Sequence, residues 1–248
     1  MQETAIVVPC YNEASRLRAA SFLEQCRAHP NLSFVFVDDG STDGTHEVIN
    51  ELAARAPGQI SALRLQANAG KAEAVRRGVV HAFASSAELV GFWDADLATP
   101  LHNIEGFAGI LERNPKAELV IGSRVRLLGR NIQRTAMRHY IGRGFATLAA
   151  LALSMPVYDT QCGAKVFRAN ATFRAIFARP FELGWSFDVE LLARLVSSAR
   201  RNGIDPETLV IEVPLDAWID VAGSKLRPSH FPRIVWELAK LFVVARKA

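Results

Sequence analysis

The sequence predicts one α/β domain in which a mainly parallel, doubly wound sheet is flanked by helices. Short apolar runs that end abruptly in polar residues alternate with longer segments of helical periodicity. The connections between successive runs are long enough for a right-handed crossover helix each time. With 248 residues, of which 50% are hydrophobic and 22% charged, the chain can bury one large core, and no linker, repeat or low-complexity segment divides it.

The N-terminal half contains four predicted strands and four predicted helices in alternation. The strands are expected at 4–9, 34–37, 60–65 and from residue 89, and the helices at 13–27, 45–56, 72–84 and 102–113. Asn12 is the expected N-cap of the first helix, because its side chain can accept a backbone N–H of the first turn.

The C-terminal half continues this pattern less regularly. Strands are expected at 119–122, near Phe167 and at 209–214, with a helix from Trp185 to about Asn202. The tail, residues 231–248, is expected to form a basic amphipathic helix that packs on the domain, on a second copy of the chain or on a membrane.

A strongly basic window lies between Leu119 and Tyr158. It contains no Asp or Glu, and its arginines are Arg124, Arg126, Arg130, Arg134, Arg138 and Arg143. Arg130, Arg134 and Arg138 are four residues apart and would share one face of a helix. This asymmetry indicates either a solvated helix face or contact with phosphate groups or a membrane surface. The longest apolar region, 145–158, is shorter than the roughly 20 residues that span a bilayer, so membrane contact is expected to be peripheral.

Acidic residues follow three of the predicted strands. Asp94 and Asp96 come directly after the run 89–93, Asp38 and Asp39 follow the second strand, and Glu13 follows the first. Because parallel strands end at one edge of a sheet, these carboxylates are expected to converge on one crevice. Neighbouring carboxylates repel unless a cation lies near them, and Mg²⁺ or Mn²⁺ takes such oxygen ligands. Asp94 and Asp96 are therefore candidate metal ligands; the alternative is a turn in which an Asp caps the next helix.

Other sequence features exclude or disfavour several classes of protein. No Gly-x-Gly-x-x-Gly follows the first strand and no Gly-Lys-Ser/Thr P-loop is present, so dinucleotide and P-loop binding are not expected. The strand-end acids would repel nucleic acid. Three cysteines without metal-type spacing and an N-terminus without a signal-peptide pattern predict a reducing, cytoplasmic location.

Four short motifs occur in an order and spacing that resembles family 2 glycosyltransferases of the GT-A fold. They are 7–13 (VVPCYNE), 37–45 (VDDGSTDGT), 68–71 (NAGK) and 94–96 (DAD). Later stretches resemble the dolichyl-phosphate β-glucosyltransferase branch: 122–124 (GSR), 159–163 (DTQCG), 185–191 (WSFDVEL) and 223–226 (GSKL). The resemblance covers nearly the whole chain. It implies an inverting, metal-dependent transfer of a sugar to a polyprenyl phosphate. The favoured sugar is glucose, and the favoured donor is UDP-glucose.

The resemblance also implies roles for individual residues. The donor nucleoside is expected to lie among Pro9, Tyr11, Glu13, Val37, Asp39, Asp94 and Ala95. Asp96, with Asp94 beside it, would hold the Mg²⁺ or Mn²⁺ that bridges the diphosphate, and Lys71 and Lys225 would contact the donor phosphates. Arg124 and Arg138 match the positions at which relatives hold the acceptor phosphate. An acceptor hydroxyl would instead need a base, for which Asp188 or Glu190 is the candidate; a favourable charge at a helix N-terminus is the alternative for both.

Two departures from the mannosyl relatives favour a UDP-sugar donor. Those relatives carry Gln where this chain has Ala98, and an Arg near the segment 218–220, where it has none. Three alternatives remain open: GDP-mannose as donor, a soluble or glycan hydroxyl as acceptor, and a nucleotide-binding, membrane-associated regulator without turnover. The domain is expected to divide into a donor half at about 1–115, an acceptor half at about 116–228 and a C-terminal helix at 229–248.

Overall fold

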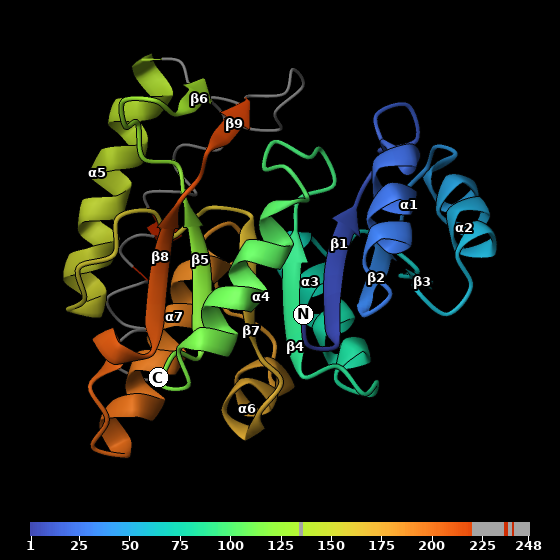
Figure 1. Ribbon diagram of the computed structural model, residues 1–248. Helices are drawn as coiled ribbons and strands as arrows, with labels where there is room; N and C mark the ends of the chain where they lie inside the picture. Colours follow the sequence, from blue (N-terminus) through green and yellow to red (C-terminus); the bar gives the residue numbers. More distant parts are fainter. Residues whose placement is uncertain (134–135, 220–235, 238–239, 241–248) are drawn as a thin grey trace.

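A seven-stranded sheet forms the centre of the molecule, with the strand order β3-β2-β1-β4-β7-β5-β8 (Figure 1). The computed structural model describes residues 1–133, 136–219, 236–237 and 240, with side chains for all of these except 136–141. The strands are β1 (Thr4–Cys10), β2 (Leu32–Asp38), β3 (Ile60–Arg64), β4 (Leu89–Trp93), β5 (Leu119–Ser123), β7 (Ala164–Arg168) and β8 (Val210–Pro214). β7 is antiparallel to both neighbours and the other neighbouring pairs are parallel, which confirms the predicted mainly parallel sheet.

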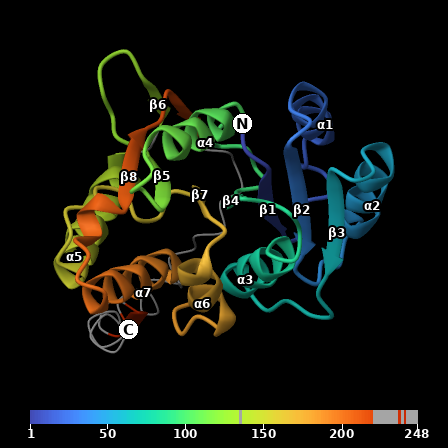
Figure 2. The ribbon, with the colours of Figure 1, turned by 60° about the horizontal axis from the view of Figure 1, so that its bottom comes forward.

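Helices cover both faces of this sheet. They are α1 (Ala19–Ala28), α2 (Thr45–Arg55), α3 (Lys71–Ala82), α4 (Asn103–Arg113), α5 (Ala136–Leu153), α6 (Ala171–Ala178) and α7 (Phe187–Arg201), followed by a 3₁₀ turn at Pro206–Thr208. Buried residues of α1, α2 and α4 form one apolar cluster with the sheet, and those of α3, α5, α6 and α7 form a second cluster (Figure 2). A separate parallel pair joins β6 (Asn131–Gln133) to β9 (Ala217–Ile219).

Strand alternation explains how one sheet serves both clusters. In β1, Ile6 and Val8 point to the cluster of α1, α2 and α4, whereas Val7 points to the cluster of α3. In β4, Trp93 points to the cluster of α1, α2 and α4, and Phe92 points to the cluster of α3. All five side chains are fully buried, as expected for strands that are covered by helices on both faces.

The close approach of α3 to the sheet sets the position of the first residue of the helix. An added Cβ at Gly78 would lie 2.3 Å from Val7 and 2.7 Å from Val37, so a larger residue would lift α3 away from β1 and β2. A crossover helix runs opposite to the parallel strands that it joins. The N-terminus of α3, Lys71, therefore lies at the carboxyl ends of the strands, where ligands bind in open α/β sheets.

The first helix begins later than the sequence predicts. The expected helix over 13–27 with Asn12 as its N-cap is wrong, because α1 begins at Ala19. Asn12 has a left-handed backbone conformation, with φ +52°, and its side-chain oxygen accepts the backbone N–H of Thr42 at 2.9 Å. Its own backbone N–H donates to Ser41 Oγ at 3.0 Å. Asn12 thus joins the loops after β1 and β2 instead of capping a helix.

The basic window does not form a single helix. Arg130 precedes β6, and α5 begins only at Ala136, so Arg130 does not share a helix face with Arg138. Arg134 lies outside the described residues, as does most of the predicted helix over 231–248, of which Trp236, Glu237 and Lys240 are described as helical. Within the described residues, the helices are too short or too polar to cross a bilayer.

Candidate active site

The turn after β4 carries the two predicted metal ligands, and hydrogen bonds fix its shape. The Asp96 carboxylate accepts the backbone N–H of Ala98 at 3.0 Å. The indole N–H of Trp93, the last residue of β4, donates to the carbonyl oxygen of Thr99 at 2.8 Å. These bonds attach the turn to the buried end of the strand, so both carboxylates are held at the carboxyl edge of the sheet.

Asp94 lies directly against the backbone of Gly163, which precedes β7. The Asp94 N–H donates to the Gly163 carbonyl oxygen at 3.1 Å. An added Cβ at Gly163 would be 1.9 Å from Asp94 Oδ2, a contact that no side chain tolerates. Only glycine therefore permits the position that Asp94 occupies.

Lys71, at the start of α3, forms an ion pair with Asp94, with Nζ 2.5 Å from Oδ1. Desolvation opposes the charged amine, but the carboxylates of Asp94, Asp188 and Asp96 outweigh it and raise the pKa of Lys71. A positive charge at a helix N-terminus is unfavourable by itself. The surrounding acids are thus the reason that an ammonium group is stable at this position.

Negative charge at the site exceeds what Lys71 neutralises. Burial and the neighbouring charge of Asp94 raise the pKa of Asp96, and Glu13 adds a smaller contribution. Crowded carboxylate oxygens of this kind suit a hard divalent cation. In the part of the chain that the structure describes, no three His, Cys, Asp or Glu side chains converge on one point. Asp94 and Asp96 therefore fit a site that a bound phosphate and water would complete.

The loop after β2 is tied to the start of α3. The Asp39 carboxylate accepts the backbone N–H groups of Ala69 at 2.8 Å and Gly70 at 2.9 Å. Gly40 has φ +65°, and an added Cβ there would lie 2.5 Å from the backbone of Ala67. The two segments are thus in direct contact, which brings Asp39 to the same edge as Lys71.

The other residues predicted around the nucleoside either lie at or just after the end of β1 or belong to the apolar core. Pro9 and Tyr11 are partly exposed at the end of β1, and Glu13 is buried close enough to act on the pKa of Asp96. Val37 and Ala95 are buried in the two apolar clusters. Their side chains belong to the core, and a nucleoside would meet their backbone instead.

Arg124 follows β5 and is locked by Asp159. Its Nε donates to Asp159 Oδ2 at 2.7 Å, its Nη2 donates to Oδ1 at 2.8 Å, and its backbone N–H donates to Oδ2 at 3.0 Å. Burial opposes the charge, but Asp159 outweighs it and raises the pKa of Arg124, with a further contribution from Asp94. The guanidinium also lies over the Trp218 ring, 5.5 Å from its centroid. Asp159 engages two of the five N–H groups, and the rest can face an anionic ligand.

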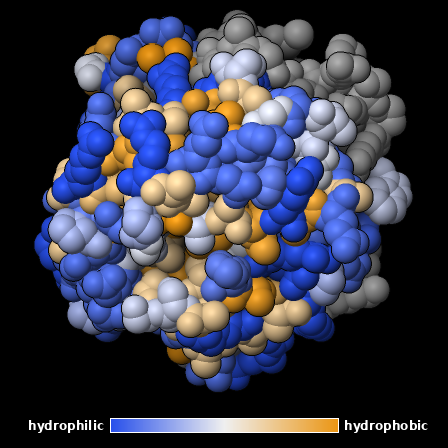
Figure 3. Space-filling model, turned by 90° about the vertical axis from the view of Figure 1, so that its right-hand side faces the viewer, coloured by the Kyte–Doolittle hydropathy of each residue, from blue (hydrophilic) through white to orange (hydrophobic). Residues whose placement is uncertain are grey.

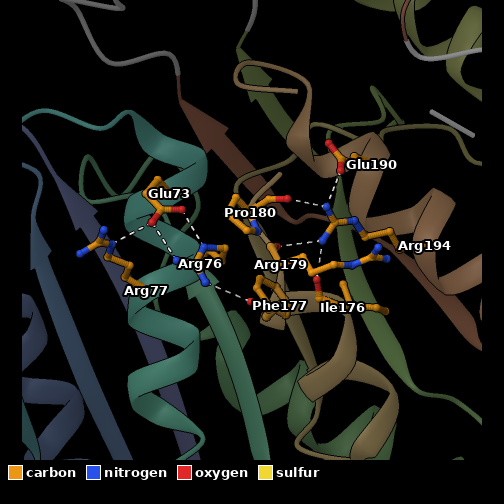
Figure 4. A network of polar contacts seen from close by, with 9 residues as sticks. All are labelled: Glu73, Arg76, Arg77, Ile176, Phe177, Arg179, Pro180, Glu190 and Arg194. Carbon is orange, nitrogen blue, oxygen red and sulfur yellow. Dashed lines mark hydrogen bonds and ion pairs between the residues drawn. The ribbon is translucent and has the colours of Figure 1, made fainter. Parts of the chain in front are cut away.

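The two candidate bases at the start of α7 are both paired with basic side chains. Asp188 is buried and accepts from Lys165 Nζ at 2.5 Å, while this fully buried lysine also donates to the Cys162 carbonyl oxygen at 2.6 Å. Glu190 accepts the backbone N–H of Leu183 at 2.8 Å and pairs with Arg194 at 2.6 Å (Figure 4). Glu190 is thus a structural residue, whereas Asp188 acts on the site through its charge on Lys71.

Glu237 is a residue at this edge that the sequence analysis missed. Its buried carboxylate accepts the backbone N–H groups of Trp185 at 3.1 Å and Ser186 at 2.9 Å, and the Ser186 hydroxyl at 2.7 Å. The C-terminal segment thereby holds the N-terminus of α7, which carries Asp188. No local pattern signals this contact, because 51 residues separate Glu237 from Ser186.

Two predicted ligands cannot be placed. The Arg138 side chain and all of Lys225 lie outside the described part of the structure. Cys162 is buried, and burial raises the pKa of its thiol to about 11, which agrees with a structural residue. A groove of about 320 Å³ between α1 and β9 touches the candidate site only through Leu97 and Ala98.

Comparison with known proteins identifies the family of the chain. The model of the family described as glycosyl transferase family 2 matches residues 5–173. A dolichyl-phosphate beta-glucosyltransferase of Trichomonas vaginalis is 33% identical, over 98% of this chain and 72% of its own length. The chain belongs to glycosyl transferase family 2. The predicted family is therefore confirmed, and this glycosyltransferase contains the family motifs at the edge of its sheet.

Further comparisons extend this result. The dolichyl-phosphate beta-glucosyltransferase of Mus musculus is 32% identical to this family 2 glycosyltransferase, over 92% of this chain and 70% of the mouse protein. Glucosyl-3-phosphoglycerate synthase from Mycobacterium tuberculosis, solved with Mn²⁺, UDP and glucosyl-3-phosphoglycerate, superposes with a TM-score of 0.69 at 18% identity, covering 98% of this chain and 80% of that one. This likeness confirms the predicted GT-A fold.

Proposed function

We propose that this glycosyltransferase transfers glucose from UDP-glucose to a polyprenyl phosphate of the dolichyl type, with inversion at the anomeric carbon. The printed names of the relatives support the sugar and the acceptor, and the solved neighbour supports UDP as the nucleotide. The observation that carries the proposal is the position of Arg124. Asp159 locks this cation beside β5, and Gly163, in the same loop as Asp159, accepts the backbone N–H of Asp94 beside β4 at 3.1 Å. A fixed cation next to the donor carboxylates suits an acceptor that is itself an anion.

Transfer to a phosphate needs no general base. The acceptor phosphate is ionised near neutral pH, so one of its oxygens forms the bond to C1 of glucose while the bond from C1 to the UDP oxygen breaks. Lys71 supplies a fixed positive charge on the side of the departing diphosphate. Asp188, the candidate base for a hydroxyl acceptor, is paired with Lys165 instead, which favours a phosphate acceptor.

Asp96 and Asp94 are the residues that would hold Mg²⁺ or Mn²⁺. The raised pKa of Asp96 supports this, because a cation relieves the repulsion between the two carboxylates. Such an ion supplies further charge neutralisation for the leaving diphosphate. We place the reaction in the cytoplasm at a membrane surface; all three cysteines are buried and free, as is usual in a reducing compartment.

A product assay tests the proposal. UDP-glucose and GDP-mannose are each offered with and without a short-chain polyprenyl phosphate, in the presence of Mg²⁺ or Mn²⁺. We expect lipid-linked glucose from UDP-glucose, loss of product with a chelator, and recovery when the metal is restored. Asp96→Asn should lower turnover on the order of a hundredfold, whereas Glu51→Gln, an exposed change on α2, should not.

Each other outcome has its own meaning. Mannose transfer would change the donor, and sugar transfer only to a soluble or glycan hydroxyl would change the acceptor. Donor binding without any turnover would identify a nucleotide-binding regulator. If neither nucleotide sugar binds, the proposed function is wrong.

A further inference from the structure

The loop between β5 and β6, residues 124–130, exposes two adjacent leucines at its tip. Leu128 is fully exposed, at 104%, and Leu127 is 47% exposed. Figure 2 shows the loop extending away from the rest of the chain beside β6. One exposed leucine is ordinary on a protein surface. Two neighbours at the point of a projecting loop form an apolar surface that a membrane or a partner would cover.

The tip is a defined turn. The backbone N–H of Arg130 donates to the Leu127 carbonyl oxygen at 3.2 Å, and Gly129 has φ +80°. A positive φ at the third residue is typical of a type II turn, and glycine adopts it without strain. An ion pair between Arg130 and Asp216 and the pairing of β6 with β9 fix the base of the loop. The turn therefore presents both leucines with little conformational entropy left to lose.

Arginines flank the tip. Arg126 and Arg130 flank the leucines and are exposed, and the sequence contains no acid between Leu119 and Tyr158. The acids that contact the loop, Asp159 and Asp216, are paired with Arg124 and Arg130. Leucines beside arginines suit a bilayer surface, because the apolar side chains enter the acyl boundary while guanidinium groups meet headgroup phosphates.

The loop begins at the residue proposed to hold the acceptor phosphate. Leu128 is four residues after Arg124, and four residues of chain span at most about 14 Å. Interfacial anchors reach about 5–10 Å into the boundary between headgroups and acyl chains. A tip seated at that depth would therefore hold the Arg124 guanidinium near the level of a lipid phosphate.

Two other described surfaces fit a membrane less well. The face over α1 and α2 is mostly hydrophilic, with small separate apolar patches (Figure 3). Leu148 and Leu151 are exposed on α5, but they lie toward the end of that helix away from β6 (Figure 1). The β5–β6 loop combines exposure, positive charge and closeness to Arg124.

We infer that the β5–β6 loop is a membrane anchor. Leu127 and Leu128 enter the boundary between headgroups and acyl chains, and Arg126 contacts anionic headgroups. This inference rests on the proposed function, since an enzyme with a lipid-borne acceptor must bring its phosphate site to the bilayer, and it names the residues that do so.

Vesicle binding tests the anchor. The full chain is sedimented with phosphatidylcholine vesicles, with and without phosphatidylserine. The double variant Leu127→Ser, Leu128→Ser should bind on the order of a hundredfold more weakly than the parent chain, because two leucine side chains no longer leave water. Arg126→Gln should lose the preference for phosphatidylserine. Val80→Ser removes an exposed apolar side chain of α3 and should bind like the parent. Unchanged vesicle binding by the double variant would overturn the inference.

An activity comparison separates the anchor from the proposed function. The double variant should lose transfer to a long-chain polyprenyl phosphate in vesicles but keep transfer to a short-chain acceptor in solution. Equal loss with both acceptors would show that the loop acts in catalysis and would overturn the anchor. If the parent chain makes no lipid-linked sugar, the proposed function fails, and vesicle binding still decides whether the loop meets a bilayer.

A fluorescent label measures insertion directly. The native cysteines are buried, so Leu128→Cys provides a selectively labelled thiol at the tip. An environment-sensitive dye there should shift to the blue with vesicles, whereas the same dye at Ile204→Cys, an exposed site after α7, should not. No shift at the tip would contradict the anchor.

Discussion

Lys71 Nζ lies 2.5 Å from Asp94 Oδ1, which joins the first residue of α3 to the turn after β4. Asp188 and Asp96 act on the same ammonium group, so one cation is the shared counter-charge of three carboxylates. Removing it leaves the charges of Asp94 and Asp96 unopposed at the edge where a diphosphate would bind, whereas Asp188 retains its ion pair with Lys165.

Replacement of Lys71 with Met should lower the turnover of UDP-glucose on the order of a hundredfold, because the leaving diphosphate loses a fixed positive charge. Lys71→Arg preserves the charge and should retain more activity than the Met variant. Steady-state kinetics of both variants, with a thermal melt to verify folding, provide the measurement. Equal activity of the Met and Arg variants would argue against an electrostatic role.

Gly163→Ala should disable the site without unfolding the protein. The new methyl group would collide with the Asp94 carboxylate, and displacement of a reacting group by about 1 Å can cost on the order of a hundredfold in rate. Gly106→Ala is the matched control, because an added Cβ in that part of α4 meets nothing within 4 Å. Wild-type kcat in the Gly163 variant would show that Asp94 can move freely.

Local patterns predicted the parts of the fold that local forces determine. The strands around Ile6 and Trp93 are continuous apolar runs buried on both faces, and their order placed Asp39 and Asp94 at one edge. Asn12 resembled an N-cap, but contacts with the loop after β2 determine its conformation.

Contacts between distant residues could not be predicted in this way. The pairs Lys165–Asp188 and Arg124–Asp159 depend on where β7 pairs within the sheet and on how α7 packs against it. Their partners are 23 and 35 residues apart, beyond any helix or strand period.

Arg124→Lys should raise the KM for the polyprenyl phosphate and leave the KM for UDP-glucose nearly unchanged. Lysine retains the charge but cannot form the bidentate contact with Asp159. We expect a rise of at least about tenfold, the loss of one charge-assisted hydrogen bond. Asp159→Asn should have a similar effect, whereas Arg27→Lys on the exposed face of α1 should have none. A rise in the donor KM alone would assign Arg124 to the donor instead.

Glu237→Ala should destabilise the N-terminus of α7, because two backbone N–H groups and the Ser186 hydroxyl lose their acceptor. The free energy of unfolding should fall by about 1–3 kcal/mol. Glu237→Gln keeps one oxygen acceptor, so its free energy of unfolding should fall less. Urea denaturation measures both, with Glu51→Ala as the exposed control, and an unchanged midpoint for Glu237→Ala would contradict the capping role.

The stability of the protein should depend on pH through Glu73. Its carboxylate pairs with two arginines of α3, Arg76 and Arg77, and Arg76 also contacts α6. Hydrogen bonds from Arg76, and then from Arg77, lower the pKa of Glu73 from 4.5 to about 2, and Arg76 also donates to the Phe177 carbonyl oxygen at 3.3 Å (Figure 4). A lowered carboxylate pKa stabilises the folded state above the unfolded-state pKa, and this contribution disappears as pH falls through the folded-state pKa.

Glu73→Gln should therefore reduce the free energy of unfolding by about 1 kcal/mol at neutral pH, after allowance for solvent screening. The difference between variant and parent should shrink as the pH falls from 4.5 toward about 2. Urea denaturation across this range tests the prediction, with Glu51→Gln as the control for loss of an exposed carboxylate. A difference that stays constant with pH would mean that Glu73 stabilises the fold through packing and not through its charge.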